Sequence, residues 1–530
     1  MKAWREPKTI IDLLDRNVTD FPQREALISV SQLSGEEMRL TWQQFDQITN
    51  QWAHALQRVG VKKSEKVALL LGNCAECYLS YVAVLKLGAI MVPVNIRLAD
   101  RELEYIFIHS EAKYLIAADA FVDSLDRIRA GIKSLKEIIV LAKDESLIPS
   151  WSLSIRGLLA GIKPSPVKTQ LNKEDASDLI YTTGTTGNPK GCILVHGGKV
   201  ACGRMIGVTF GFRRLWVGWD RCQNPFPFFT SSGISSMFMP WLYYGYTEIL
   251  EQTFDVEKTL KTIEKEKSTV YLAAPSMYIL IMDHPKFANY DLSSIKTFGY
   301  GGSLMPEELM VRINKKWPGI RLYHVYGLTE GGTGGLMCTA ADAMRKSGAI
   351  GLPWGPDQEV KIVDENDMDL PPEEVGEIVL RGPNIMQAYY KDDKATEETL
   401  KNGWLHTGDL GRMDSEGFVY FVDRKKDMIV RGGFNVYAVE VENVLYEHPA
   451  VSQCAVIGKP HKVLGGDVMA MIVLRPRAKA SAEELIAFCK DKLADFKRPR
   501  VIEFRESLPL NPMGKVDKKI LRSSVKERGN

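Results

Sequence analysis

Short apolar runs that alternate with amphipathic segments constrain the fold of this chain more than any other feature of its sequence. In residues 45–60 the apolar side chains recur at steps of three and four, which is the spacing of one helix face, and Gly60 ends the segment. Residues 76–88 have the pattern of a second helix. Unbroken apolar runs typical of buried strands lie between such helices, at 66–72, 90–95, 113–118 and 137–142. This order predicts an α/β fold in which helices cover both faces of a parallel sheet.

The pattern changes further along the chain. Between about 350 and 422, short strand-like runs are separated by Gly, Pro and acidic turns, which favours a β-rich subdomain. After the charged segment 423–427, the last block mixes helix-like and strand-like runs, as in a small α+β domain. Because 530 residues exceed what one hydrophobic core supports, two domains are expected. We predict a large N-terminal domain of packed mixed and parallel sheets with helices, residues 1–424, and a small mobile C-terminal domain, residues 425–530.

Composition and charge exclude several classes of protein. The formal net charge of +2 gives no basic excess for a nucleic-acid partner. No apolar run reaches the roughly 18 residues of a membrane span, so no integral membrane contact is expected. The first ten residues lack the apolar stretch of a signal peptide, which favours a cytoplasmic enzyme. The eight cysteines are too few and too scattered for a disulfide scaffold. We interpret the CxxC pair, Cys74 and Cys77, as small side chains at a helix start rather than a redox or metal site.

Residues 181–191, YTTGTTGNPKG, concentrate hydroxyls, glycines and one lysine after a strand-like run at 176–181. Glycine lets backbone N–H groups approach a phosphate closely, hydroxyls add donors, and a lysine neutralises charge. A Walker A loop is excluded because Lys190 is followed by Gly191 and no GK[ST] occurs in the chain. The alternative, a plain surface loop, leaves so many donors beside a lysine unexplained. The segment therefore predicts a phosphate-binding loop of another kind.

The run TTGTTGNPKG resembles the phosphate loop of the acyl-adenylate-forming superfamily, which includes acyl-CoA synthetases, peptide-synthetase adenylation domains and beetle luciferases. Further matches follow in the order of that family: YGLTE at 326–330, GWLHTGDL at 403–410, a hinge and glycine loop at 423–442, and a terminal lysine motif at 511–522. The resemblance covers nearly the whole chain. It implies that ATP and a carboxylic acid give acyl-AMP and pyrophosphate, and that coenzyme A then takes the acyl group as a thioester. The alternative is a free-standing acyl- or aryl-acid adenylating enzyme that loads another thiol carrier.

By the same resemblance, the phosphate loop binds the β- and γ-phosphates of ATP. Its binding residues are Thr182, Thr183, Gly184, Thr185, Thr186, Gly187 and Lys190. The resemblance gives Thr329 a hydrogen bond to the α-phosphate, and it gives Glu330 and Thr185 to Mg²⁺, which prefers hard oxygen ligands. Tyr326 would face adenine, and Gly327 and Gly302 are further residues expected to bind the cofactor. Considered without the family, the YGLTE stretch would be a loop with a capping Thr–Glu pair.

Four further roles rest on the resemblance. Asp409 resembles a carboxylate that accepts both ribose hydroxyls, with Arg424 as a second ribose contact. The alternative for Asp409 is an ordinary turn aspartate. Lys515 resembles the catalytic lysine that bridges the acid and the α-phosphate. Lys426 matches the hinge between the domains. The loop that would line a tunnel for the thiol of coenzyme A matches Gly432 and Gly433.

The resemblance places the acid pocket on residues that are apolar or small. They are Phe228, Phe229, Thr230, Gly301, Ser303 and Gly331, with Gly302 and Gly332 beside them. None carries a charge, and an unpaired buried charge is costly, so we expect a monocarboxylic acid with an apolar body. Medium-chain fatty or aromatic acids should therefore be used in preference to acetate.

The sequence departs from the family pattern at two positions. Thr230 stands where many members carry a gating histidine, and Ala438 stands where a proline is usual. The histidines, including His324 and His406, have neither metal spacing nor a nucleophile partner, so we interpret them as core or surface residues. A homodimer is common in the family and is possible for this chain.

Overall fold

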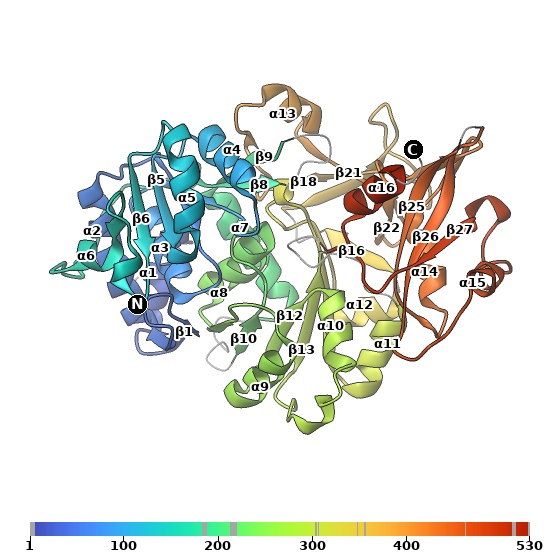
Figure 1. Cartoon of the computed structure of the whole chain (residues 1–530), viewed down its shortest axis with the longest axis horizontal. Helices are drawn as coiled ribbons and strands as arrows, with labels where there is room; N and C mark the ends of the chain where they lie inside the picture. The colour runs from blue at the N-terminus through green and yellow to red at the C-terminus, as the bar shows by residue number, and fades with distance from the viewer. Residues whose placement is uncertain are drawn as a thin grey trace.

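The computed structural model describes residues 6–182, 188–212, 220–302, 305, 307–346, 348–353, 357–461, 463–510 and 516–527. Over these residues the chain forms three sheets that follow one another along the longest axis of the molecule (Figure 1). The blue and cyan N-terminal part lies at one end, the green and yellow part in the middle, and the red C-terminal part at the other end.

The N-terminal sheet has eight strands among the described residues. Its order is β19 (Ala388–Tyr389), β9 (Lys190–Val195), β8 (Ala176–Thr182), β4 (Ile90–Pro93), β3 (Lys66–Leu70), β5 (Tyr114–Ala118), β6 (Glu137–Leu141) and β7 (Leu153–Ser154). The run from β8 to β7 is parallel, whereas β9 and β19 are antiparallel at one edge. The predicted buried strands are confirmed. Their apolar runs form strands of this kind because a parallel sheet is covered on both faces.

The second sheet has fourteen strands among the described residues. Its order is β17 (Glu359–Val363), β18 (Gly376–Arg381), β21 (Trp404–Met413), β22 (Val419–Arg424), β16 (Ala349–Pro353), β15 (Leu336–Cys338), β14 (Arg321–Tyr326), β13 (Thr297–Gly301), β12 (Val270–Ala273), β10 (Arg221–Asn224), β11 (Thr247–Leu250), β1 (Glu25–Val30) and β2 (Glu37–Thr41), with β20 (Leu400–Lys401) paired to β21. The stretch from β14 to β1 is parallel. The predicted β-rich part exists, but the pairing of β16 with β22 joins it to the larger sheet.

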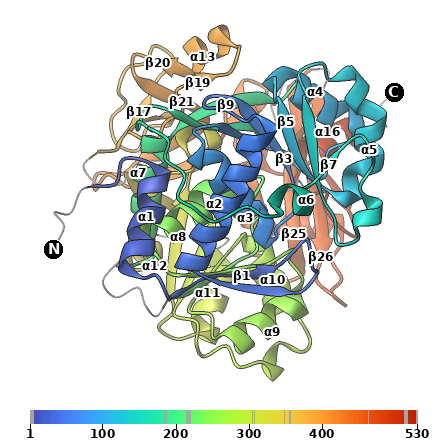
Figure 2. The ribbon, with the colours of Figure 1, turned by 90° about the vertical axis from the view of Figure 1, so that its left-hand side faces the viewer.

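A layer of helices fills the space between the first two sheets. It contains α1 (Ile10–Asp20), α2 (Trp42–Val59), α3 (Ala75–Lys86), α7 (His196–Thr209) and α8 (Met239–Tyr244). Figure 2 shows α1 and α2 side by side in this layer. Every residue of α3 is buried, and the helix contacts β1 of one sheet and β3 and β4 of the other.

The predicted end of the helix at Gly60 is confirmed. Gly60 has φ 104°, a left-handed conformation that favours glycine, and its N–H donates to the carbonyl groups of Leu56 and Gln57. At the other end of α2, the side chains of Thr41 and Gln44 form a capping box. The boundaries of this helix therefore follow from local chemistry.

The outer faces of the sheets are covered by further helices. The N-terminal sheet packs against α4 (Asp100–Ser110) and α5 (Val122–Ile128), and α6 (Ile155–Leu159) follows β7. The second sheet packs against α9 (Val256–Glu266), α10 (Pro275–Met282) and α11 (Glu307–Lys316). The remaining helices of this part are α12 (Ala340–Arg345) and α13 (Asp393–Thr399). The short turns of helix are η1 (Asp119–Phe121), η2 (Arg129–Gly131), η3 (Glu145–Leu147), the π-helix η5 (Ser232–Phe238), η6 (Phe287–Asn289), η7 (Thr329–Gly331) and η8 (Asp495–Lys497).

The C-terminal part forms a small α+β domain with its own core, as predicted. Its sheet has the order β24 (Phe434–Val436), β23 (Ile429–Arg431), β26 (Gly465–Leu474) and β25 (Val451–His461), with β27 (Val501–Phe504) paired to β26. One face packs against α14 (Ala438–Tyr446) and α15 (Ala482–Phe488), and the other against α16 (Lys518–Glu527). The long hairpin of β25 and β26 is the centre of this domain.

All eight cysteines are buried free thiols. Cys74 is the N-cap residue of α3 and Cys77 lies in its first turn. The interpretation of this CxxC pair as small side chains at a helix start is confirmed.

A buried ion pair connects the helix layer to the N-terminal sheet. Lys199 of α7 and Asp178 of β8 are 1% and 0% exposed, and Lys199 Nζ lies 3.5 Å from Asp178 Oδ2. The hydroxyls of Tyr81 and Ser177 donate to Asp178 at 2.7 and 2.6 Å. Lys199 Nζ also donates to Ser235 Oγ at 2.8 Å. The two charges are therefore paired and hydrogen-bonded, which is the condition under which buried charges are tolerated.

Replacement of Lys199 should destabilise the protein strongly. We expect Lys199→Met to lower the free energy of unfolding by about 3–5 kcal/mol, because it leaves Asp178 as an uncompensated buried charge. Denaturation in guanidinium chloride measures this change. The double variant Lys199→Met with Asp178→Asn should recover part of the loss, and Lys163→Met, at an exposed lysine, should have little effect. A Lys199→Met protein as stable as the wild type would contradict the assignment.

Candidate active site

A cavity of about 950 Å³ opens where strands of the first two sheets end. Thr182 at the end of β8 and Gly301 at the end of β13 line it, and Gly327 follows directly after β14. Residues of β21, β22 and the following turn complete the lining: Thr407, Gly408, Asp409, Arg424, Lys425 and Lys426. The carboxyl edge of a parallel sheet is where open α/β folds place their ligand sites. The cavity therefore collects most of the sequence motifs in one place.

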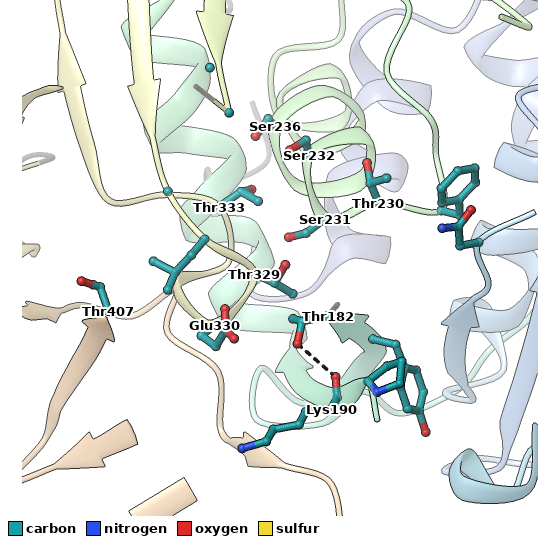
Figure 3. Close-up of a pocket in the computed structure, with 18 of the residues that line it drawn as sticks. Thr182, Lys190, Thr230, Ser231, Ser232, Ser236, Thr329, Glu330, Thr333 and Thr407 are labelled. Carbon is teal, nitrogen blue, oxygen red and sulfur yellow. Dashed lines mark hydrogen bonds between the residues drawn. The ribbon is translucent and has the colours of Figure 1, made fainter. Parts of the chain in front are cut away.

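One end of the cavity carries the polar groups that suit phosphate. Thr182 Oγ1 donates to the carbonyl oxygen of Lys190 at 3.5 Å across the β8–β9 pair (Figure 3). Lys190 Nζ lies 3.7 Å from Asp392 Oδ2 and 5.0 Å from the centre of the Tyr389 ring. Between these two strands, Thr183, Gly184, Thr185, Thr186 and Gly187 lie outside the described residues. The described flanks of the loop place a cation and a hydroxyl at the cavity.

Thr329 and Glu330 lie in η7, directly after β14, and both line the cavity. The Tyr389 hydroxyl donates to Glu330 Oε1 at 2.7 Å, and the backbone N–H of Met386 donates to the carbonyl oxygen of Glu330 at 2.7 Å. Burial, together with the neighbouring carboxylate, raises the pKa of Tyr389, so its phenol remains a donor. These contacts fix a carboxylate at the polar end of the cavity.

The position of Glu330 fits Mg²⁺. The described residues hold no cluster of three His, Cys, Asp or Glu side chains that could enclose a metal ion. Magnesium at nucleotide sites is usually held by one or two carboxylates and the substrate phosphates, so a single cavity-facing carboxylate is sufficient. Thr185, the other predicted ligand, lies outside the described residues.

Asp409 and Arg424 face each other on β21 and β22 and line the cavity together. Arg424 Nε lies 3.5 Å from Asp409 Oδ1, and the Tyr326 hydroxyl donates to Asp409 Oδ2 at 2.7 Å. Burial and the Asp409 charge both raise the pKa of Tyr326. A carboxylate that is only 8% exposed is thus held in place by two partners.

Tyr326 does not line the cavity, although it was expected to face adenine. Its ring packs partly buried against the core of the β-rich part, and its hydroxyl holds Asp409. Gly327 lines the cavity instead. A Cβ atom on Gly327 would lie 2.2 Å from the carbonyl oxygen of Thr333, so only glycine fits this close approach of two backbone segments.

Some of the predicted acid-pocket residues line the cavity and others do not. Phe229, Thr230, Gly301 and Gly302 line it. Phe228 is 1% exposed and packs against Tyr78, Tyr81 and Phe238, with ring centres 4.7 to 5.5 Å apart. Of the two phenylalanines, Phe229 therefore lies at the cavity and Phe228 lies in the core.

Gly331 and Gly332 lie behind the cavity wall and do not line it. Gly331 is buried beside Leu328 and Leu405. Gly332 has φ 57°, and a Cβ atom there would lie 2.5 Å from the carbonyl oxygen of Asn384. Gly332 thus permits a tight backbone turn, and Thr333 lines the cavity in place of the two glycines. Ser303 lies outside the described residues.

Several hydroxyl groups of the lining were not predicted as site residues. Ser231, Ser232 and Ser236 come from the loop before η5 and from η5 itself, and Figure 3 shows them along one side of the cavity. The run TSSGISS was visible in the sequence, but its helix type was not. Tyr389 was also missed, because it reaches Glu330 only through the pairing of β19 with β9, far apart in the sequence.

The predicted hinge residue and the predicted glycine loop both follow β22, but only the hinge residue lies at the cavity. Lys426 lines the cavity, and burial lowers its pKa. Gly432 and Gly433 do not line it; with φ 60° and 85° they form the turn of the β23–β24 hairpin. Two consecutive positive φ values suit the two-residue turns of hairpins, for which glycine is favoured. Lys515 lies outside the described residues, between Leu510 and Val516, which form an antiparallel bridge.

The backbone of Ala438 makes a contact that proline, the usual residue at this position in the family, could not make. Its backbone N–H donates to Asp423 Oδ2 at 2.5 Å and begins α14. Proline has no N–H, so this bond exists only because the position is not proline. Burial raises the pKa of Asp423 to about 6.

The buried histidines serve as core residues. His324 stacks on Tyr300 with ring centres 4.6 Å apart, and burial lowers its pKa to about 4, so it is neutral near pH 7. His406 lies between Asp367 and Glu377, on the β-rich part. Neither lines the cavity.

Comparison with known proteins assigns the family. The sequence pattern of the AMP-binding enzyme family matches residues 14–390, and that of the AMP-binding enzyme C-terminal domain matches residues 440–515. The chain belongs to the AMP-binding enzyme family. This membership confirms the expected superfamily and explains why the motifs meet at one cavity.

Relatives and solved structures match the chain over nearly its full length. It is 33% identical over 537 residues to a long-chain-fatty-acid–CoA ligase of Bacillus subtilis (strain 168), covering 96% of this chain and 93% of that one. It is 32% identical over 494 residues to a feruloyl-CoA synthase of Amycolatopsis sp, covering 92% and 94%. The structure of the anthranilate CoA ligase AuaEII in complex with anthranoyl-AMP has a TM-score of 0.91 and 30% identity, covering 100% of both chains.

These findings confirm the expected α/β fold with a smaller C-terminal domain. The chain is an AMP-forming acid–thiol ligase of the acyl-CoA synthetase type, and acyl-CoA ligases of this family use ATP, Mg²⁺ and coenzyme A. Among the helices of the described residues, none has both the length and the apolar character needed to cross a membrane.

Loss of the Tyr326 hydroxyl should weaken the binding of ATP. Tyr326→Phe removes the donor that holds Asp409 in the cavity, and a hydrogen bond to a charged group contributes about 1.5 kcal/mol or more. We therefore expect the KM for ATP to rise about tenfold, with a smaller change in the KM for the acid. Steady-state kinetics with each substrate varied in turn measures this. Tyr323→Phe makes the same change on the same strand outside the cavity and is the control. An unchanged KM for ATP in Tyr326→Phe would contradict the role of Asp409.

Proposed function

We propose that the enzyme activates a medium-chain fatty acid or an aromatic acid as acyl-AMP and transfers the acyl group to coenzyme A. The observation that carries this proposal is the unequal polarity of the cavity. Its charged side chains, such as Lys190, Glu330 and Asp409, belong to the phosphate and ribose motifs. The part beside Phe229 and Gly301 has only neutral lining residues. One cavity thus offers a place for a charged nucleotide next to a place for an uncharged acyl body.

The nucleotide roles follow from the positions of the described side chains. We assign the β- and γ-phosphates to Thr182, Lys190 and the loop between them, and the α-phosphate to Thr329. Asp409 and Arg424 would hold the ribose, because a carboxylate accepts two hydroxyl groups at once. Glu330 would hold Mg²⁺, which neutralises phosphate charge when bound. Gly302 and Gly327 leave space for adenine beside the backbone.

Carboxylate attack on the α-phosphorus brings two anions together, so neutralisation and positioning supply most of the catalysis. Lys190 contributes a cation that is already held at the cavity by Asp392. We assign the second cation to Lys515, delivered by the C-terminal domain. A lysine on a separate domain can leave after adenylation and make room for the thiol.

We place the domain boundary between residues 424 and 425 and the hinge at Lys426. Arg424 is the last residue of β22 in the large sheet, and the C-terminal sheet begins with β23 at Ile429. An exposed ion pair, Arg475 with Glu308 at 3.4 Å, is one contact between the two domains. Exposed ion pairs contribute little, so this contact would oppose a rotation only weakly. Gly432 and Gly433 are proposed to reach the thiol path after that rotation.

The cellular context also remains a proposal. Eight buried free thiols suit a reducing compartment, and we propose the cytoplasm. A homodimer stays a prediction from the family.

Removal of Lys515 should separate the two half-reactions. We expect Lys515→Ala to reduce acyl-AMP formation by orders of magnitude, because the charge that bridges the acid and the α-phosphate is lost. Attack of coenzyme A on supplied acyl-AMP should be largely retained. Single-turnover assays of each half-reaction measure this, with Lys519→Ala, an exposed lysine of α16, as the control. Equal loss of both half-reactions would refute the assignment.

The choice of acid should follow the neutral part of the cavity. We expect acetate to have a kcat/KM at least about tenfold below that of the best medium-chain or aromatic acid, since each buried methylene contributes about 0.8 kcal/mol. A pyrophosphate-release screen of carboxylic acids, with and without coenzyme A, measures this and separates a CoA ligase from an enzyme that loads another thiol carrier. A profile that peaks at acetate, a dicarboxylate or an amino acid would overturn the proposal.

A further inference from the structure

One wall of the neutral part of the cavity is built from hydroxyl groups. Ser231 precedes the π-helix η5, and Ser232 and Ser236 lie four residues apart within it. All three line the cavity, and Figure 3 shows their side chains along the same side, across from Thr333. A purely apolar acid would leave this wall without a partner.

Among the hydroxyls of this wall, that of Ser231 points most directly to a ligand. The residue is only 5% exposed, and its Oγ has no hydrogen-bond partner in the described part of the chain. Its neighbours differ: Thr230 Oγ1 donates to the carbonyl oxygen of Pro227 at 2.7 Å and accepts from the N–H of Gly233 at 3.0 Å. Thr333 Oγ1 donates to the carbonyl oxygen of Gly332 at 2.7 Å. Buried polar groups are normally hydrogen-bonded, so the partner of Ser231 is expected to come from a ligand.

The wall is held in place from behind. Ser235, next to Ser236 in η5, accepts a hydrogen bond from Lys199 Nζ at 2.8 Å, and its carbonyl oxygen accepts from Cys202 Sγ at 3.6 Å. Lys199 is in turn paired with Asp178. The wide π-helical turn thus directs Ser235 toward α7 while Ser232 and Ser236 face the cavity. Hydroxyls on such a fixed support can discriminate between ligands, because little order must be gained on binding.

Part of the neutral lining is apolar. Phe210 and Leu272 form it together with Gly299. A Cβ atom on Gly299 would lie 2.6 Å from both side chains, so these side chains pack directly on the backbone of β13. This contact leaves no room for a side chain at Gly299, and the two apolar side chains offer an aromatic ring a surface to pack against.

Among the described residues that line the cavity, none that belongs to the hydroxyl wall is charged; Lys199, which bonds Ser235, lies behind the wall and is paired with Asp178. The charged residues of the described lining are the ones at the nucleotide end, at the β19–α13 connection and in the turn after β22: Lys190, Glu330, Asp392, Asp409, Arg424, Lys425 and Lys426. The group that meets Ser231 must therefore be neutral, because a second charge would be buried without a partner.

We propose that the acid is an aromatic carboxylic acid that carries a neutral hydrogen-bonding substituent, a hydroxyl or an amino group, and that Ser231 determines this specificity. The proposal rests on the proposed function and narrows its substrate class. The ring occupies the space between the hydroxyl wall and Phe229, and the substituent supplies the partner that Ser231 lacks. Ser232 and Ser236 offer further hydroxyls to the same group.

The test compares matched pairs of acids. Benzoic, phenylacetic and cinnamic acids are assayed beside their ring-hydroxylated and ring-aminated analogues, with octanoic acid as an alkyl reference. For the wild type we expect kcat/KM to be about tenfold or more higher for the best substituted acid than for its parent, as for one hydrogen bond to a neutral group. In Ser231→Ala that ratio should fall toward one. Ser524→Ala, the same change on α16 outside the cavity, should keep the wild-type ratio.

The outcomes separate this inference from the proposed function. Equal use of parent and substituted acids by the wild type, a ratio that survives in Ser231→Ala, or use of octanoic acid alone would overturn the inference and leave an acyl-CoA ligase. Absence of pyrophosphate release with every acid would overturn the proposed function itself. A ratio that falls in Ser231→Ala but not in Ser524→Ala supports the specificity role.

Discussion

The buried ion pair between Lys199 and Asp178 is the contact on which the geometry of this enzyme depends. Asp178 belongs to β8, the strand that leads into the phosphate loop, and Lys199 belongs to the helix layer between the sheets. Tyr81 of α3 and Ser235 of η5 complete the same network. Because neither charge can be left unpaired in the interior, the pair connects β8, which precedes the phosphate loop, with η5, which carries the hydroxyl wall. A buried ion pair outside the cavity lining therefore helps to fix the relative position of the two ends of the cavity.

The cavity combines two environments that a single strand or helix could not provide. Its polar end uses strand ends and short turns, where backbone and side-chain groups are free to face a ligand. Its neutral end uses a π-helix and the backbone of β13, which approach closely because Gly299 has no side chain.

Local sequence patterns predicted most of the fold but only part of the site. The buried strands and the helix that ends at Gly60 were predictable because burial periodicity and capping act over a few residues. The burial of Phe228 in the core depends on Tyr78, which is distant in the sequence, and on Phe238 of η5. The contact of Tyr389 with Glu330 depends on the pairing of β19 with β9, and no local pattern encodes it. Tyr326 is not part of the cavity lining because its ring packs against the β-rich part, and its expected contact with adenine stays a prediction.

The bond between Asp423 and the N–H of Ala438 joins the last strand of the large sheet to the first helix of the small domain. The polypeptide between these two residues contains the turn that follows β22. Any reorientation about that turn must break the bond or move both groups together. The hydrogen bond from this one backbone N–H therefore helps to hold the arrangement seen here. With a pKa of about 6, the carboxylate is mostly ionised near pH 7, the form that accepts this proton most strongly. Protonation of Asp423 below this pKa would weaken the bond, and a proline at position 438 would remove it because proline has no N–H.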